Sequence, residues 1–159
     1  MTPEDANLLR SLLTDRSVLS LGVLIDGDPY VGLVPFAARN DFSSLIIHAS
    51  RLARHTRGLA EGAPFGVMIH ALEAPGEDPL QLPRLSLQGK VRIVTPDSAE
   101  YEDCKQAYVQ KFPQSEMTFS LGDFQLYELQ LKAGRLVAGF ARTLNVNTEH
   151  FRDLAGLKS

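Results

Sequence analysis

The segment 84–94 alternates polar and apolar side chains, and this period of two residues is the period of a β-strand. A strand with one polar and one apolar face is typical of an antiparallel sheet that covers a core on one side only. The polar face carries Arg84, Ser86, Gln88, Lys90 and Arg92, and the apolar face carries Leu85, Leu87, Val91 and Ile93. The rest of the chain must therefore supply further strands and a cover for that core.

Several other segments read as short strands joined by turns. Residues 18–25 and 30–37 are rich in β-branched and aromatic side chains and flank Asp26-Gly27-Asp28-Pro29, which predicts a β-hairpin. Residues 45–49 and 64–72 predict two more strands. Residues 125–131 and 136–140 predict a second hairpin around Lys132-Ala133-Gly134-Arg135.

Helix signals stand at the start, in the middle and at the end of the chain. Thr2 and Pro3, followed by two acids, predict an N-cap and a first helical turn. Helices are also predicted for 50–61, for 95–112 and for 148–157. The stretch 73–83 is predicted to be a long exposed loop. About seven strands with these helices predict a mainly β fold, a small antiparallel barrel with helices packed on it.

Composition limits the setting in which such a fold acts. The 159 residues, 44% of them hydrophobic, fit a single domain, here residues 1–159. A lone cysteine, Cys104, and the absence of a secretory or membrane-spanning segment favour the cytoplasm. The net charge of −3 argues against a nucleic-acid partner.

The most informative segment is Ser50-Arg51-Leu52-Ala53-Arg54-His55-Thr56-Arg57, read as the start of a helix. Helix starts favour acids, yet this one carries three arginines and no acid before Glu61. A bound phosphate would offset these charges by accepting hydrogen bonds from free amides, the Ser50 hydroxyl and the guanidinium groups. The alternative is three solvated arginines that pair with the acidic loop 73–78.

Other signals for chemistry are weak. The sequence has no Gly-rich phosphate loop, no nucleophile elbow and no metal-binding helix, and its histidines lack close metal-ligand spacing. Cys104 lies on an apolar stripe and reads as a buried thiol. Arg84 and Gln88 share one strand face, which is either a binding surface or plain solvent exposure. No catalytic acid or base is predicted.

Four landmarks give the sequence a family resemblance: Gly27-Asp28-Pro29-Tyr30, Ser50-Arg51-Leu52-Ala53-Arg54-His55-Thr56, Pro83-Arg84-Leu85-Ser86-Leu87-Gln88-Gly89 and Gly139-Phe140-Ala141. With these, the chain resembles the FMN-binding split-barrel family related to pyridoxamine 5′-phosphate oxidase, in its haem-utilisation branch.

The resemblance implies a split antiparallel β-barrel and an FMN-dependent oxidoreductase acting on a small substrate or electron donor. It places the FMN phosphate on Ser50 and Arg51, with His55, Thr56 and Arg57 close behind. The ring would lie along Val34, Pro35 and Phe36. It also implies a homodimer with flavin at the interface, which Arg84 and Gln88 reach from the neighbouring subunit.

Two further hypotheses remain open at this point. One is binding or breakdown of haem, for which His150 is the first candidate ligand. Relatives in that branch carry an additional C-terminal segment, and the sequence ends at Ser159, so a reduced single-domain flavoprotein is the preferred interpretation. The other is a carrier that binds flavin or haem without catalysis.

Overall fold

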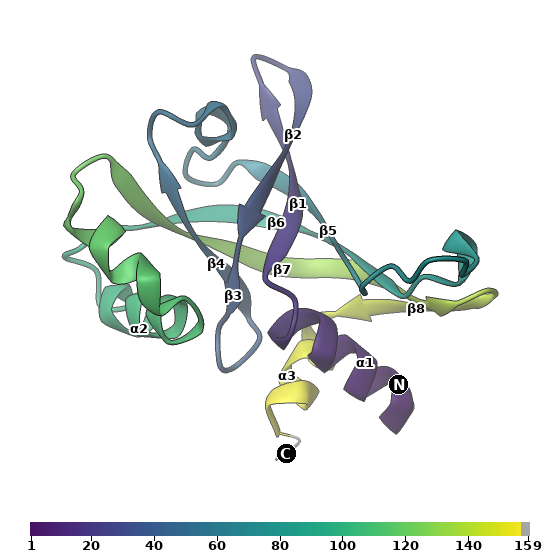
Figure 1. Ribbon diagram of the computed structural model, residues 1–159. Coiled ribbons are helices and arrows are strands. Elements are labelled where there is room, and N and C mark those ends of the chain that lie inside the picture. The colour runs from purple at the N-terminus through teal and green to yellow at the C-terminus, as the bar shows by residue number, and fades with distance from the viewer. Residues whose placement is uncertain (157–159) are drawn as a thin grey trace.

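The computed structural model describes residues 1–156, and its centre is one curled antiparallel sheet that forms a half-barrel (Figure 1). The strand order is β2-β1-β5-β6-β7-β4-β3, and β8 pairs with β7. The mainly β fold predicted from the sequence is confirmed. The strands are β1 (Val18–Ile25), β2 (Asp28–Pro35), β3 (Ala37–Ala38), β4 (Ser44–Ser50), β5 (Pro64–His70), β6 (Arg84–Val94), β7 (Phe124–Gly139) and β8 (Arg142–Asn147).

The first hairpin forms as predicted. Asp26 and Gly27 make a two-residue turn, and both have positive φ, 53° and 84°, which the right-handed twist of a hairpin requires. Gly27 adopts this conformation without steric cost because it has no Cβ.

Within residues 1–156, three α-helices flank the sheet: α1 (Pro3–Thr14), α2 (Tyr101–Lys111) and α3 (Thr148–Gly156). The predicted cap at Thr2 is confirmed, since its Oγ1 accepts a hydrogen bond from the Asp5 N–H at 3.1 Å. The predicted terminal helix is also confirmed as far as Gly156, and Leu157 lies outside the described residues. The described part of the chain also contains three short 3₁₀ helices: η1 (Arg54–Gly58), η2 (Pro79–Gln81) and η3 (Pro113–Ser120).

Two buried clusters hold these elements together. The larger one fills the half-barrel, and α1 and α3 close one end of it side by side (Figure 1) with Leu9, Leu12, Phe151 and Leu154. The smaller one lies between α2 and the sheet and includes Ile46, Val94, Cys104, Tyr108 and Leu126. Cys104 is a buried thiol, as the sequence predicted.

The predicted turn at residues 132–135 is wrong, because β7 continues through it as one strand of 16 residues. Gly134 is small because a Cβ there would collide with the Ser86 carbonyl oxygen of β6, so the glycine permits a close approach of strands. Lys132 is an extra residue opposite the step from Gln88 to Gly89, which makes a β-bulge. The reversal comes later, at 139–142, and leads into β8.

The predicted helix at 50–61 is also wrong. The Ser50 hydroxyl accepts a hydrogen bond from the Leu52 N–H at 3.1 Å, and Ala53 is extended with ψ 140°, so the chain turns before any helix begins. Only the five residues of η1 are helical. Gly58 then passes so close to β1 that a Cβ would lie 2.5 Å from the Val23 Cβ.

The middle helix begins at Tyr101 and not at 95. The Ser98 N–H donates to the Thr95 carbonyl, and the Tyr101 N–H donates to the Ser98 carbonyl, so two successive turns precede the helix. Glu100 is held by an ion pair of 2.9 Å with Arg92 of β6. These tertiary contacts override the start signal at Thr95-Pro96.

Candidate functional site

The end of β4 and the segment that follows it bring together the residues of the predicted phosphate site. Ser50 is the last residue of β4, and its hydroxyl donates to the Asp123 carboxylate at 3.1 Å. Asp123 comes from the turn before β7, which pairs with β4 so that Ser50 lies opposite Phe124. An acid therefore stands beside Ser50, although the sequence around Ser50 contains none.

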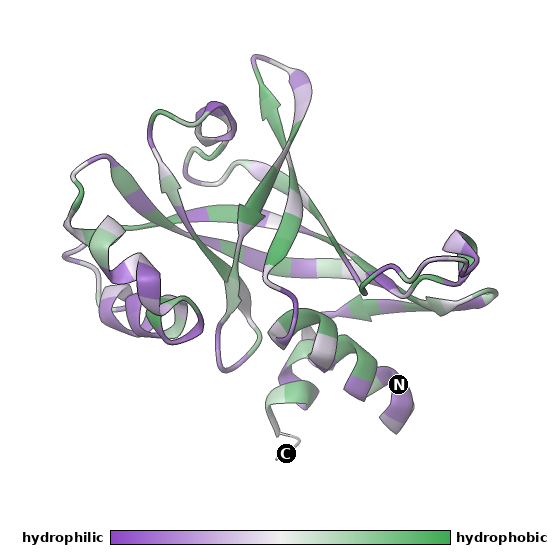
Figure 2. Cartoon of the chain, viewed as in Figure 1, coloured by the Kyte–Doolittle hydropathy of each residue, from purple (hydrophilic) through white to green (hydrophobic). Residues whose placement is uncertain are grey.

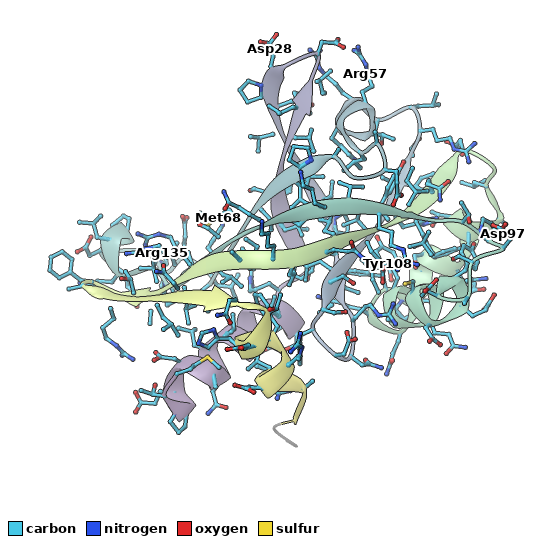
Figure 3. The ribbon with its side chains drawn as sticks, turned by 180° about the vertical axis from the view of Figure 1, so that it is seen from behind. Asp28, Arg57, Met68, Asp97, Tyr108 and Arg135 are labelled. Carbon is cyan, nitrogen blue, oxygen red and sulfur yellow. The ribbon has the colours of Figure 1, made fainter. Side chains whose placement is uncertain are left out.

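The three arginines have different surroundings. Arg57 is engaged, because its Nη2 forms an ion pair of 2.9 Å with Asp26 at the β1–β2 turn, and Figure 3 shows it at this end of the hairpin. Arg54 lies over the Tyr30 ring at 5.3 Å. Arg51 donates to the Gln125 side chain at 3.3 Å. Arg51 and Arg54 thus form no ion pair with any carboxylate within residues 1–156.

None of the three arginines pairs with the acidic loop 73–78 in the described part of the chain. That loop projects from the opposite end of the half-barrel (Figure 1). The alternative interpretation of the arginine cluster is therefore wrong within one protomer.

His55 and Thr56 pack inward. The Thr56 hydroxyl donates to the Ser50 carbonyl at 2.6 Å and fixes η1 to the end of β4. His55 lies against Gly32 of β2, where a Cβ would come within 3.3 Å of its Nδ1. Its Nε2 is buried and has no hydrogen-bond partner, and burial lowers the pKa of the imidazole. Among the described residues, His55 thus keeps a buried ring nitrogen without a hydrogen-bond partner.

The segment predicted to lie along the flavin ring, at the end of β2, exposes mainly backbone groups. The side chains of Val34 and Phe36 are buried in the core, whereas Pro35 is exposed. β2 is the edge strand, and the Phe36 N–H donates to the Ser17 carbonyl at 3.1 Å. By the alternation of an antiparallel ladder, the backbone groups of Val31 and Leu33 point away from β1 and stay free at the edge.

Arg84 and Gln88 lie at a different place, on the outer face of the sheet. Arg84 pairs with His70 across β5, and Gln88 pairs with Gly66. Arg84 donates to the Leu82 carbonyl at 3.0 Å, and Gln88 is exposed. The structure thus leaves both on a surface, and the role implied for them across a dimer interface stays a prediction.

The strongest charge cluster is elsewhere, beneath α2. Glu128 is buried and receives hydrogen bonds from Arg39 at 2.6 Å, Ser44 at 3.2 Å and Cys104 at 3.4 Å, with Arg92 at 3.6 Å. Burial and the nearby carboxylate raise the pKa of Cys104 to about 12, which keeps the thiol protonated. This cluster joins α2 to the sheet, and it offers no nucleophile.

Two further histidines, His48 and His150, lie outside this site. His48 stacks on Phe119 at 3.9 Å and contacts Thr118 through Nδ1 at 3.2 Å, and burial lowers its pKa to about 4. His150 Nδ1 accepts from the Asn147 N–H at 3.2 Å, at the start of α3. Among residues 1–156, no three His, Cys, Asp or Glu side chains cluster as metal ligands.

The described residues contain no helix with the length and apolar character needed to span a membrane.

Two residues of the site escaped the sequence analysis. Arg54 belonged to the arginine run but was not assigned to the site, and Asp123 becomes a neighbour of Ser50 only through the β4–β7 pairing.

No family model and no curated protein matches the sequence. Solved structures do match the fold. A haem-binding protein from Mycobacterium smegmatis has a TM-score of 0.83 at 23% identity, and the match covers 96% of this chain and 62% of that one. The chain thus spans less than two thirds of that protein.

Two further structures show the same fold. HutZ, the haem storage protein from Vibrio cholerae, has a TM-score of 0.69 at 22% identity, over 78% of this chain and 87% of that one. A FAD- and haem-binding protein from Mycobacterium smegmatis has a TM-score of 0.65 at 20% identity, over 89% of this chain and 80% of that one. The structural neighbours of this half-barrel therefore include flavin-binding and haem-binding proteins.

Proposed function

We propose that this protein binds FMN as a homodimer and acts as an oxidoreductase on a small molecule. The observation that carries the proposal is the pair of arginines, Arg51 and Arg54, that have no carboxylate partner in the described residues. A doubly charged phosphate monoester matches two guanidinium groups that have no carboxylate partner. The flavin-binding neighbour of the same fold supports the choice of ligand.

In this proposal each group has one task. Arg51 and Arg54 bind the phosphate, and Thr56 holds η1 in place through its bond to the Ser50 carbonyl. The free backbone edge of β2 and the exposed Pro35 orient the ring, while Arg84 and Gln88 act from the neighbouring subunit. Bound FMN supplies hydride or electron transfer, and the protein supplies binding and electrostatics.

The two arginines suit a phosphate, but the surroundings of Ser50 and Arg57 do not. The Ser50 proton is already engaged by Asp123, and the Asp123 carboxylate repels an anion placed beside Ser50. Arg57 is likewise neutralised by Asp26. The arginines, rather than Ser50, therefore carry the phosphate contact.

The test is an FMN titration followed by quenching of flavin fluorescence. Arg51→Ala removes a charge-assisted contact worth about 1.5 to 3 kcal/mol, so the dissociation constant should rise about 10- to 150-fold. Arg152→Ala, an exposed arginine on α3, is the charge-matched control and should leave it unchanged. Equal FMN affinity in wild type and Arg51→Ala would refute the phosphate site.

Haem binding is the second candidate, favoured by a groove of about 780 Å³ between α1 and α3 that His150 lines. The His150 Nδ1 is occupied by the Asn147 N–H, which leaves Nε2 for a metal. A haem titration of wild type and His150→Ala tests it: tight binding that the variant loses supports haem, and weak binding in both leaves flavin. A protein that binds and releases flavin but oxidises or reduces no substrate would instead be a flavin carrier.

A further inference from the structure

A cleft of about 320 Å³ lies between α1, β3 and α2. Figure 1 shows β3 between the two helices, and β3 pairs with the first half of β4, so the cleft is separate from the Ser50 end of that strand. Leu13 and Phe42 line it, and Figure 2 shows that the half of α1 nearest the sheet is mainly hydrophobic. The cleft therefore has an apolar wall and the volume of a site for a small molecule.

Lys111, the last residue of α2, brings an amine into this cleft. Its Nζ lies 4.2 Å from the centroid of the buried Phe36 ring and donates to the Arg16 carbonyl at 2.5 Å. Lys111 forms no ion pair with a carboxylate within residues 1–156. An ammonium removed from water normally has an anionic partner, whereas this one has a carbonyl and a ring.

These surroundings favour the neutral form of the amine. Burial lowers the pKa of Lys111 to about 8, and Asp15 opposes this shift while Arg16 adds to it. A lysine that is desolvated and lies near another cation is the kind of lysine that acts as a nucleophile toward carbonyl compounds.

The described residues that line the cleft include no carboxylate. Arg39 lines it but is paired with Glu128 at 2.6 Å, and Arg10 of α1 lies over the Phe42 ring at 5.3 Å. Neutral polar side chains come from all three sides of the cleft: Thr14, Asn40 and Gln110. This lining suits an uncharged ligand with polar substituents.

We propose that Lys111 is the nucleophile of a second site, which binds a small uncharged aldehyde and condenses with it to an imine. The site is independent of the flavin and of the homodimer. The lone pair of the neutral Nζ forms a bond to the carbonyl carbon, and one N–H proton moves to the carbonyl oxygen. The resulting carbinolamine loses its hydroxyl and the second N–H proton as water, which leaves a C=N bond. Amine and aldehyde thus give imine and water, and no oxidant or reductant is consumed.

Reductive trapping tests this site. Wild type is incubated with glycolaldehyde and cyanoborohydride, whose hydride converts an imine to a stable secondary amine, and peptide mapping locates the modified lysines. At about pH 7.5, Lys111 should be modified about 10- to 100-fold faster than the exposed Lys90 and Lys132, because more of its amine is neutral. The rate at Lys111 should rise with pH and level off above about 8. Modification of Lys111 at the rate of the two exposed lysines would overturn the proposal.

Two variants separate a binding site from a merely reactive amine. Ala107→Leu keeps Lys111 and fills the cleft one turn of α2 away, so trapping at Lys111 should fall about tenfold while Lys132 is unaffected. Lys105→Met is the matched control, because Lys105 lies on the same helix but faces Glu116 at 3.8 Å, and trapping at Lys111 should not change. Undiminished trapping at Lys111 in Ala107→Leu would overturn the cleft as the site. None of these outcomes depends on flavin binding.

Discussion

At the scale of single residues, the candidate site is defined by which charges have partners. Arg57 is neutralised by Asp26 and the Ser50 hydroxyl by Asp123, while Arg51 and Arg54 have no acidic partner in the described chain. Exposed ion pairs contribute little to stability, but they decide which cations remain available to a ligand. The phosphate contact is therefore assigned to two arginines and not to the whole cluster.

Asp123 gives the first prediction. Replacing it by asparagine keeps the shape and the hydrogen-bond acceptor for Ser50 but removes a negative charge beside the phosphate. FMN affinity should rise about 3- to 10-fold in Asp123→Asn at moderate ionic strength. Riboflavin has no phosphate and serves as the internal control, since its affinity should not change. A lower FMN affinity in Asp123→Asn would mean that the carboxylate helps to hold the ligand.

His48 gives a prediction about acid stability. Its pKa is lowered to about 4 in the fold by burial, against an ordinary value of 6.5, so the unfolded chain binds a proton more readily than the folded one. Stability should fall as the pH drops from 6.5 toward 4, and above 6.5 this group contributes nothing to the pH dependence.

Thermal unfolding at several pH values checks this. His48→Phe keeps a ring against Phe119 and removes the titration, so its Tm should fall less than that of wild type between pH 6.5 and 4. Two parallel curves would show that other groups cause the acid sensitivity.

At the scale of elements, glycine has different structural roles at two positions. Gly27 makes the β1–β2 turn with a φ of 84°, whereas Gly134 lies inside β7 because the β6 backbone passes too close for a side chain. Both look like turn signals in the sequence. The difference is made by a neighbouring strand that is remote in the chain.

Gly134→Ala tests this account of β7. The new Cβ would collide with the Ser86 carbonyl oxygen, so the variant should lose about 1 to 3 kcal/mol of unfolding free energy in urea titrations. Gly122→Ala is the matched control, because its Cβ meets open space and the change should stay within about 0.5 kcal/mol. A tolerated alanine at 134 would favour a turn at that position.

The same distinction explains how far the sequence could be interpreted. Local patterns predicted the first hairpin, the alternation in β6, the cap at Thr2 and the terminal helix, because each depends on neighbours in the chain. The turn at 132–135 was wrong because a neighbouring strand decides the conformation of Gly134. The helix at 50–61 was wrong because a local turn at Ser50 and an extended Ala53 come before any helix. The arginine run pointed to the site, but Asp123 joins it only through the β4–β7 ladder.

At the scale of the whole molecule, a net charge of −3 conceals a separation of charge. Acids gather on the arm at 71–83, whereas Arg84, Lys90 and Arg135 of the outer face and Arg51 and Arg54 near the β4 end lack acidic partners within residues 1–156. The half-barrel thus presents two arginines without acidic partners at one end and an acidic projection at the other (Figure 1). In the homodimer that we propose, Arg84 and Gln88 of the partner subunit complete the site.

The most direct test of the central claim compares the affinities of FMN and riboflavin for the wild-type protein. Both carry the same ring, so a difference reports the phosphate alone. Recognition by Arg51 and Arg54 predicts that riboflavin binds at least about tenfold more weakly, and that the difference shrinks as salt rises. Equal affinity for the two flavins, or no measurable binding of FMN, would contradict the proposed site.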